Sequence, residues 1–368
     1  MLNSKEKERY GRHIALPEVE EEGQLKLKNA KVLVVGAGGL GSPILQYLSA
    51  AGVGTIGIVD DDLVEDSNLQ RQVLYNTLEI GKPKAIMAKE KLKKLNPFVA
   101  FQIINERLTP KNAVALFELY DLIIDGSDNF PTRYLVNDAC VVTNKPLIYG
   151  SIYKYEGQVA VFNYKKGATY RCVFPNPPKD SETPNCNEMG VLGTVTGIIG
   201  SIMANECLKI ILEIGNVLSS KILIIDTLTM SQSIIEHKLI RKNLKVKVLE
   251  DYGAVCNIGI QAESGEITAS ELKARIDQNN KIQILDVREK FEFDICKIEN
   301  SILIPLTVLA SRHREIRKDI DTVVICHHGI RSLKAIEFLE QFGYGKLINL
   351  KGGIHAWANE VDPEMEQY

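Results

Sequence analysis

The sequence lacks a strong excess of either charge, because 44 basic and 47 acidic side chains leave a formal net charge of −3. This balance disfavours nonspecific binding to nucleic acid or to an anionic membrane surface. Residues 1–10 are charged and lack the apolar core of a signal peptide. The most apolar run, residues 191–214, contains Glu206 and Lys209, which favours a buried helix over a membrane span. We therefore expect no nucleic-acid partner and no membrane partner.

Cysteine is also scarce, with seven residues scattered along the chain. An odd number without an export signal predicts reduced thiols and a cytoplasmic protein rather than a disulfide framework. The proportions of charged residues (25%) and hydrophobic residues (45%) are those of an ordinary soluble globular protein. A length of 368 residues predicts two or three domains.

A glycine-rich turn follows residues 31–35, which are mostly β-branched and apolar and which we predict to form a buried strand. The glycines of the turn are Gly36, Gly38, Gly39 and Gly41. Bare backbone can approach a phosphate, and the following helix begins with free N–H groups, so the turn predicts an anion site. Asp60 ends the next apolar run, at the position where an acidic residue meets a ribose hydroxyl. The pattern predicts a nucleotide site, with a tight turn that serves only packing as the alternative.

Charged side chains downstream narrow the choice of nucleotide. Arg71 and Lys84 supply cations, and the segment 125–129 supplies carboxylates. A glycine turn can largely satisfy the two phosphates of a dinucleotide by itself, whereas a triphosphate with its metal needs both kinds of group. These residues therefore favour a metal-bound nucleoside triphosphate over NAD.

Four stretches of this region resemble the MoeB/ThiF/HesA family of adenylating enzymes, which are relatives of ubiquitin-activating enzymes. They are GAGGLGS at 36–42, VDDDLVEDSNLQRQ at 59–72, GKPK at 81–84 and DGSDN at 125–129. The resemblance implies that the chain uses ATP and Mg²⁺, with Asp128 as the magnesium ligand. It also implies nucleotide contacts from Asn68, Arg71, Lys84 and Asn129. A helix cap is the alternative role for Asp128.

Residues 8–16 resemble the short N-terminal helix of the same family. In that family an arginine of this stretch crosses a dimer interface and touches the partner's triphosphate. Arg12 occupies the matching position, so the resemblance implies a homodimer whose active sites are completed in trans. A solvated amphipathic helix is the alternative interpretation of this segment.

Cysteines give two further expectations for the first domain. Cys186 follows a proline-rich loop and matches the family's candidate for a covalent bond to the substrate protein, with a buried structural thiol as the alternative. Family members also carry two pairs of zinc-binding cysteines, but Thr169 and Gly253 stand at two of these four places. The remaining Cys172 and Cys256 do not make a four-ligand site, so we predict no structural zinc.

The last third of the chain resembles a rhodanese, which is a sulfurtransferase domain. The matching stretches are LDVRE at 285–289, CHHGIRS at 326–332 and GGIHAW at 352–357. Cys326 follows a predicted strand and precedes a helix, so backbone N–H groups, the helix dipole and Arg331 all favour an anionic sulfur there. We therefore predict that Cys326 carries a persulfide, with a structural cysteine as the alternative. The two histidines after Cys326 are interpreted as loop-lining residues rather than metal ligands.

Helix and strand patterns alternate through both parts of the chain, which is typical of an α/β fold. We predict a Rossmann-like, doubly wound, mostly parallel sheet, followed by a smaller α/β rhodanese domain. The predicted boundaries are 1–248 for the adenylating domain, 249–262 for a linker and 263–368 for the rhodanese-like domain.

The two domains together imply one reaction. The first adenylates the C-terminal glycine of a small ubiquitin-like sulfur-carrier protein ending in Gly-Gly, and the Cys326 persulfide then yields a thiocarboxylate. The persulfide donor is expected to be an enzyme such as a cysteine desulfurase, and the product to serve molybdopterin, thiamine or tRNA thiolation. Three alternatives stay open: an activator of a ubiquitin-like modifier through a thioester, a non-catalytic scaffold, and an NAD-dependent oxidoreductase. The last leaves Arg71, Lys84 and the segment 125–129 unexplained.

Overall fold

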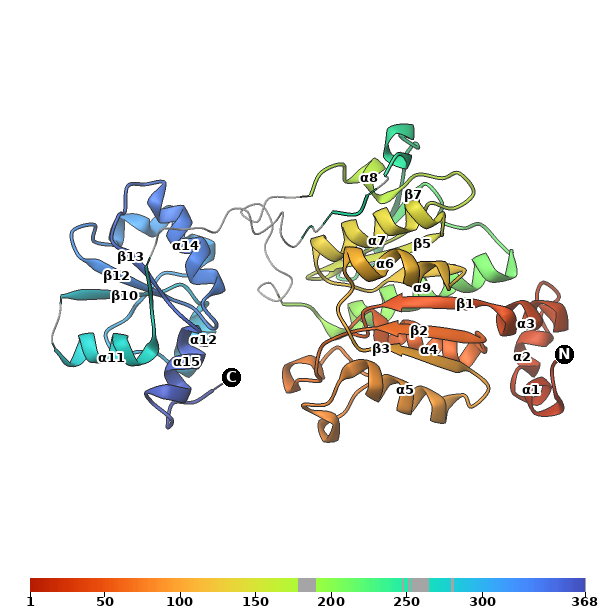
Figure 1. The fold of residues 1–368 in the computed structure, drawn as a ribbon, viewed down its shortest axis with the longest axis horizontal. Helices are drawn as coiled ribbons and strands as arrows, with labels where there is room; N and C mark the ends of the chain where they lie inside the picture. Colours follow the sequence, from red (N-terminus) through yellow and green to blue (C-terminus); the bar gives the residue numbers. More distant parts are fainter. Residues whose placement is uncertain (178–189, 247, 251, 253–264, 279–280, 368) are drawn as a thin grey trace. The chain divides into compact units, whose positions relative to one another are not determined.

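The computed structural model describes residues 1–177, 190–246, 248–250, 252, 265–278 and 281–367. The chain forms two compact units, Met1–Asn257 and Ile258–Tyr368, each built around one sheet (Figure 1). The predicted linker, 249–262, lies mostly outside the described residues. Its described Tyr252 is buried, and the Tyr252 hydroxyl donates to Asp138 Oδ2 over 2.6 Å. Tyr252 therefore packs with the first unit, and the domain boundaries stay a prediction.

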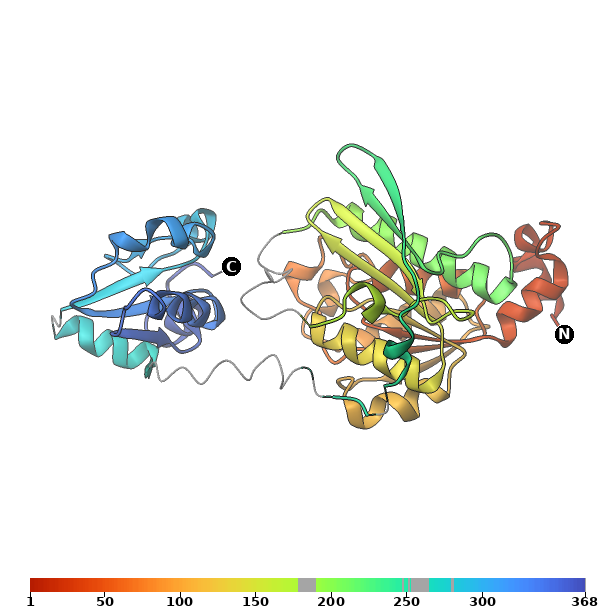
Figure 2. The same cartoon turned by 90° about the horizontal axis from the view of Figure 1, so that it is seen from above.

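The first unit is built on an eight-stranded sheet of order β3-β2-β1-β4-β5-β6-β7-β8. The parallel strands are β1 (Lys31–Val35), β2 (Thr55–Val59), β3 (Ala100–Ile104), β4 (Leu122–Asp125) and β5 (Leu147–Tyr153). The antiparallel strands are β6 (Glu156–Phe162), β7 (Lys221–Asp226) and β8 (Ser231–Glu236). Figure 2 shows the β7–β8 hairpin at the edge of this sheet. The predicted Rossmann-like, mostly parallel sheet is confirmed.

Most helices of the first unit cover the two faces of this sheet. The described helices of this unit are α1 (Ser4–Arg9), α2 (Gly11–Ile14), α3 (Glu20–Asn29), α4 (Gly41–Ala51), α5 (Lys84–Leu95), α6 (Pro110–Glu118), α7 (Phe130–Thr143), α8 (Tyr170–Val173) and α9 (Gly193–Leu212). Among these described helices, α1 and α2 contribute no residue to the cores packed against the sheet. In β1, Val32 and Val34 pack in one core with α4, α5 and α9, whereas Leu33 and Val35 pack in a second core with α6 and α7. Successive side chains of a strand point to opposite faces, so a strand covered on both faces is apolar throughout.

Within the described part of the chain, α9 is the one helix that is long and apolar enough to span a membrane. Buried core helices of soluble proteins have the same length and composition. Val195, Ile199 and Met203 of α9 are fully buried in the core that also contains β1 and α4. These contacts agree with the sequence-based prediction of a buried helix.

The second unit is a five-stranded sheet of order β11-β10-β12-β13-β9, in which every described pairing is parallel. Its strands are β9 (Gly265–Ile267), β10 (Ile282–Asp286), β11 (Ile302–Leu303), β12 (Asp321–Ile325) and β13 (Leu347–Leu350). Its helices are α11 (Ala269–Asp277), α12 (Lys290–Ile295), α13 (Leu309–Arg312), α14 (Ile330–Glu340) and α15 (Gly353–Glu360). Two apolar cores lie against this sheet, as expected for a parallel sheet covered on both faces. The predicted smaller α/β domain is confirmed.

The strand order places a ligand crevice in the first unit. From β1 the chain moves to β2 and β3 on one side and then returns to β4 and β5 on the other side. Connections that leave in opposite directions open a crevice at the carboxyl ends of the two central strands. The ends of β1 and β4 are therefore where a ligand is expected.

Candidate active site

A cavity of about 950 Å³ lies at the carboxyl ends of β1, β2 and β4. The predicted nucleotide-binding residues that line it are Gly36, Gly38, Gly39, Asp60, Asn68, Arg71, Lys84, Asp128 and Asn129. Gly41 and Arg12 do not line it. The structure thus brings together in one place residues that are up to 93 positions apart in the sequence, from Gly36 to Asn129.

The glycine turn is compact because two of its residues have no room for a side chain. Gly36 has a left-handed φ of 90°, which favours glycine. At Gly41, the first residue of α4, an added Cβ would lie 2.1 Å from the carbonyl oxygen of Gly36. Gly41 therefore closes the turn by permitting a close backbone approach, although its sequence pattern predicted a ligand contact.

We expect Gly41→Ala to lower the free energy of unfolding by about 1–3 kcal/mol, since the neighbour that must move is backbone. Gly197→Ala on α9 is the matched control, because no atom lies within 4 Å of the added Cβ. A helix-interior alanine there should stabilise the protein by about 0.5–1 kcal/mol. Urea unfolding followed by far-ultraviolet circular dichroism measures both changes. Equal stabilities of the two variants would contradict the assigned role of Gly41.

The Asp60 carboxylate braces the glycine turn. Its Oδ2 accepts a hydrogen bond from the backbone N–H of Ala37 (2.7 Å), and its Oδ1 accepts from that of Asp62 (2.9 Å). Burial raises the pKa of Asp60, and these backbone donors and Lys84 oppose that rise. Each carboxylate oxygen has a second lone pair, so the predicted ribose contact is compatible with this bracing.

The two cations predicted from the sequence, Arg71 and Lys84, lie in the wall of the cavity. The Lys84 side chain is buried at the start of α5, and its Nζ lies 2.8 Å from Oδ2 of the exposed Asp62. Arg71 donates from Nη1 to the carbonyl oxygen of Ser67 over 3.1 Å. Both cations line the cavity, where they can offset the charge of a phosphate chain.

Buried amide groups on the same wall have unused hydrogen-bonding capacity. Asn68 Oδ1 and Gln72 Oε1 are buried and have no hydrogen-bond partner among the described residues. Leaving a buried polar atom unsatisfied costs about 1–3 kcal/mol. Both side chains line the cavity, so a polar ligand or metal ion there would relieve this cost.

Residues 125–129, at the carboxyl end of β4, have different structural roles. Asp125 is 1% exposed, and its Oδ1 accepts from the backbone N–H (3.0 Å) and hydroxyl (2.6 Å) of Ser127. Burial raises the pKa of Asp125. Asn129 caps α7, since its Oδ1 accepts from the N–H of Thr132 over 3.0 Å. The cap proposed as an alternative role for Asp128 is thus supplied by Asn129, which leaves the exposed Asp128 carboxylate in the cavity wall.

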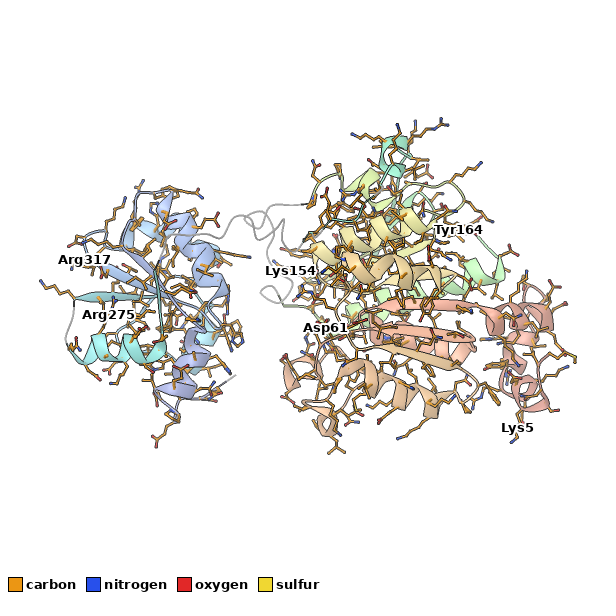
Figure 3. The ribbon with its side chains drawn as sticks, in the orientation of Figure 1. Lys5, Asp61, Lys154, Tyr164, Arg275 and Arg317 are labelled. Atoms are coloured by element: carbon orange, nitrogen blue, oxygen red, sulfur yellow. The ribbon has the colours of Figure 1, made fainter. Side chains whose placement is uncertain are left out.

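Sequence reasoning missed three cations of the cavity, Arg107, Arg133 and Lys154. Arg133 lies one helical turn beyond Asn129 on α7, and its guanidinium lies 5.5 Å from the ring centroid of Tyr149. Helical spacing from the cap residue was a signal that could have indicated Arg133. Lys154 lies between β5 and β6, and Figure 3 shows it at the same end of the first unit as Asp61. No local motif marked Lys154.

Arg12 lies at the opposite end of the first unit from the cavity. The hydroxyl of neighbouring Tyr10 accepts from Asn96, which follows the last residue of α5. The helix α5 begins at the cavity with Lys84 and has 12 residues, a length of about 18 Å. Figure 3 likewise shows Lys5 of α1 far from Asp61 and Lys154. Within one chain, the exposed Arg12 therefore lies away from the cavity.

Of the cysteines predicted to act in the first domain, only Cys172 is described, and Cys186 and Cys256 lie outside the described residues. The Cys172 sulfur accepts from the N–H of Ile240 over 3.2 Å and from Asn243 Nδ2 over 3.6 Å. Burial alone would raise the pKa of Cys172, but hydrogen bonds from Thr169, Ile240 and Asn243 produce a net lowering. Nothing in these contacts tests the prediction of no structural zinc.

In the second unit, Cys326 follows β12 at the start of a tight loop. Its sulfur accepts a hydrogen bond from the N–H of Gly329 over 3.1 Å and lies 3.3 Å from the hydroxyl oxygen of Ser332. Cys326 as a whole is 1% exposed. Gly329 has a left-handed φ of 94° and precedes α14. The Ser332 hydroxyl also donates to Asn349 Oδ1 over 2.6 Å. The backbone N–H of Gly329 is thus one of the predicted donors to the Cys326 sulfur, and the loop leads directly into α14.

Arg331 forms a two-pronged ion pair with Glu292 of α12. Nη1 and Nη2 each lie 2.6 Å from a different carboxylate oxygen. Both side chains are largely buried, so the pair is well shielded from water. The pair joins α12 to α14, a contact that the sequence-based assignment of Arg331 to the sulfur did not anticipate.

The histidines after Cys326 differ in environment. His327 is partly buried, and His328 is exposed. Burial, followed by the neighbouring His328, lowers the pKa of His327 to about 4. His327 is therefore neutral at pH 7.

Comparison with known proteins agrees with this geometry. The profile of the ThiF family matches residues 10–247, and that of the rhodanese-like domain matches residues 268–360. The chain belongs to the ThiF family. This confirms the predicted family and the predicted C-terminal rhodanese domain.

Relatives of this ThiF-family protein share both parts of the chain. It is 42% identical to "Probable adenylyltransferase/sulfurtransferase MoeZ" of Mycobacterium tuberculosis, over 100% of this chain and 96% of the relative. It is 38% identical to "Adenylyltransferase and sulfurtransferase MOCS3" of Aedes aegypti, over 100% of this chain and 90% of the relative. A "Sulfur carrier protein adenylyltransferase" of Thermus thermophilus is 48% identical over 69% of this chain and 97% of the relative.

Solved structures support the fold of the ThiF-family protein. The crystal structure of Escherichia coli MccB with ATP superposes with a TM-score of 0.57 and 24% identity. The superposition covers 67% of this chain and 75% of MccB. At this identity the likeness bears on the fold alone.

Proposed function

We propose that this protein is an enzyme that adenylates the C-terminal glycine of a ubiquitin-like sulfur-carrier protein and converts it to a thiocarboxylate. The observation that carries the proposal is the cavity, which unites the glycine turn, Arg71, Lys84 and Asp128. The same chain carries the Cys326 loop, and relatives over its full length are named for both activities.

The first step joins the carrier to a nucleotide. The glycine turn holds phosphate oxygens through backbone N–H groups, and Arg71 and Lys84 offset their charge. The carrier's C-terminal carboxylate attacks the α-phosphate of ATP, and pyrophosphate leaves with the bonding electron pair. The product is an acyl-adenylate, in which AMP is a good leaving group.

The oxygen donors of the cavity fit Mg²⁺, which prefers carboxylate and carbonyl ligands. Asp128 is exposed on the wall, and Asn68 Oδ1 is buried without a hydrogen-bond partner among the described residues. These two residues would hold the ion. Bound there, it would supply positive charge where negative charge grows on the pyrophosphate.

The second step transfers sulfur. The outer sulfur of a Cys326 persulfide attacks the acyl carbon and expels AMP, which gives an acyl disulfide between the carrier and Cys326. A thiol then attacks the Cys326 sulfur, so the disulfide bond breaks and the carrier leaves as a thiocarboxylate. The attacking thiol and Cys326 are left as a disulfide, which a cellular reductant reopens; Cys186 is our candidate for that thiol.

Arg12 is proposed to act on the cavity of a partner subunit. It lies exposed at the far end of its own unit, so contact with a nucleotide requires a second copy. We therefore propose a homodimer with composite sites.

Mixing Arg12→Ala protein with Asp128→Ala protein should restore part of the adenylating activity that each variant lacks. A mixed dimer contains one site in which both residues are intact, so recovery approaches half of the sites in mixed dimers. ATP–pyrophosphate exchange measures the recovery, and native mass spectrometry verifies that subunits have exchanged. No recovery in verified mixed dimers would contradict the trans arrangement.

The remaining expectations are proposals of the same kind. The protein is cytoplasmic, receives sulfur from a donor such as a cysteine desulfurase, and serves molybdopterin, thiamine or tRNA thiolation. Its adenylating unit carries no structural zinc, because Thr169 stands where a thiolate would be needed. Binding of nucleic acid or membrane forms no part of the proposal.

The decisive experiment offers the enzyme small carriers ending in Gly-Gly, with MgATP and a persulfide source. Intact-mass spectrometry should show exchange of one oxygen for sulfur at the carrier's C-terminus. A stable thioester to the enzyme without a thiocarboxylate would instead indicate a modifier activator. No carrier-dependent pyrophosphate exchange would overturn the proposal.

A further inference from the structure

Three histidines, two from the Cys326 loop and one from α15, lie close together. His327 and His328 belong to the loop after β12, and His355 belongs to the first turn of α15. One ring nitrogen of each lies within 4.8 Å of the others. The ring centroids of His327 and His328 are 4.1 Å apart, and those of His328 and His355 are 5.0 Å apart. The sequence showed only the adjacent pair, without a third ligand.

Backbone contacts fix this meeting. The N–H of Ile354 donates to the carbonyl of Cys326 (2.8 Å), and the N–H of His355 donates to the carbonyl of His327 (3.1 Å). At Gly353 an added Cβ would lie 2.3 Å from the carbonyl oxygen of His327. The loop and the start of α15 are therefore in direct backbone contact, so the three imidazoles stay near one another even when their side chains rotate.

The cluster is open to solvent, and the charged residues Arg331 and Glu292 of the same unit pair with each other. His328 and His355 are exposed, and His327 is partly buried. Arg331, the second residue of α14, forms an ion pair with Glu292 through two 2.6 Å contacts, which offset its charge. The positive charge of Arg331 is therefore offset when a cation approaches the imidazole groups.

We propose that His327, His328 and His355 bind a divalent cation of the zinc class. Neutral imidazole suits zinc, copper and nickel, whereas magnesium and calcium prefer oxygen. Three histidines with a fourth position left to water form a known type of open zinc site. Zn–N bonds of about 2.0–2.1 Å need nitrogens about 3.3 Å apart, which the two exposed rings reach by rotation.

A bound ion would tie the Cys326 loop to α15 through side chains as well as backbone. Since sulfur transfer requires an acceptor to reach this loop, zinc would slow that step. This consequence rests on the proposed function, whereas the binding of zinc does not.

The test is a zinc titration of the full-length protein against a chromophoric chelator, without ATP or carrier. We expect wild-type protein to take one equivalent of zinc from the chelator. The variants His355→Ala and His328→Ala should bind this zinc at least 10-fold more weakly. His13→Ala is the matched control, since His13 lies on α2 of the first unit, and it should bind as wild type does. Circular dichroism verifies that each variant is folded.

Thiols are a competing source of zinc affinity, so Cys172→Ser is titrated in parallel. The histidine site is supported if Cys172→Ser still binds one equivalent of zinc and His355→Ala does not. Equal affinity of wild type and His355→Ala would overturn it, as would loss in Cys172→Ser alone. Since the titration involves neither adenylation nor sulfur transfer, failure of the proposed function would leave this result unchanged.

Discussion

Replacement of Asp128 by alanine should lower carrier-dependent ATP–pyrophosphate exchange by about 10²–10³-fold or more. The physical reason is the loss of a ligand for the metal that neutralises the triphosphate. Because Asn129 and not Asp128 caps α7, the substitution removes a carboxylate from the cavity without removing a helix cap. The measurement is incorporation of labelled pyrophosphate into ATP at saturating carrier.

Asp66→Ala is the matched control for this variant. Asp66 is an exposed carboxylate in the same region that does not line the cavity, so its loss changes net charge equally. Exchange by Asp66→Ala should stay within a few-fold of wild type. Full exchange by Asp128→Ala, or an equal loss in both variants, would show that Asp128 does not hold the metal.

Replacement of Cys326 by alanine should end thiocarboxylate formation while pyrophosphate exchange continues. The substitution removes the proposed nucleophile, and its structural cost, the loss of the acceptor for the N–H of Gly329, is confined to the second unit. The cavity residues all belong to the first unit, so adenylation does not use this sulfur. Carrier mass and exchange rate are measured on the same preparation.

Cys296→Ala is the control, because Cys296 is a second free cysteine of the same unit. It should make thiocarboxylate as wild type does. Loss of exchange in Cys326→Ala would refute the division of labour between the two units. Persistent thiocarboxylate in that variant would show that another sulfur is the donor.

The sequence predicted the parts of the fold that depend on local pattern. The predicted strand at 31–35, whose residues are mostly apolar, has the same bounds as β1. The glycine turn and Asp60 follow neighbouring strands, so their meeting at one edge of the sheet could be anticipated from the rule for carboxyl ends. The two domain types were likewise predicted from short motifs in order.

Contacts between distant segments were not predictable in the same way. The pairing of Arg331 with Glu292, and the approach of His355 to the Cys326 loop, depend on how α12, α14 and α15 pack. The sequence analysis considered Asp128 as the cap of α7, whereas the structure gives this role to the next residue, Asn129. The choice between neighbouring polar residues depends on backbone angles. Side-chain direction in tertiary packing is the information that spacing alone does not contain.

The depth of Cys326 makes its reactivity depend on its chemical state. With 1% of the residue exposed, the bare thiol offers little surface to an oxidant or to an activated carrier. In the proposed reaction, persulfide loading adds a second sulfur about 2.05 Å beyond the buried one, and this outer atom attacks the carrier. Under this proposal the unloaded thiol presents little surface for alkylation or acylation, and loading with sulfur supplies the accessible nucleophile.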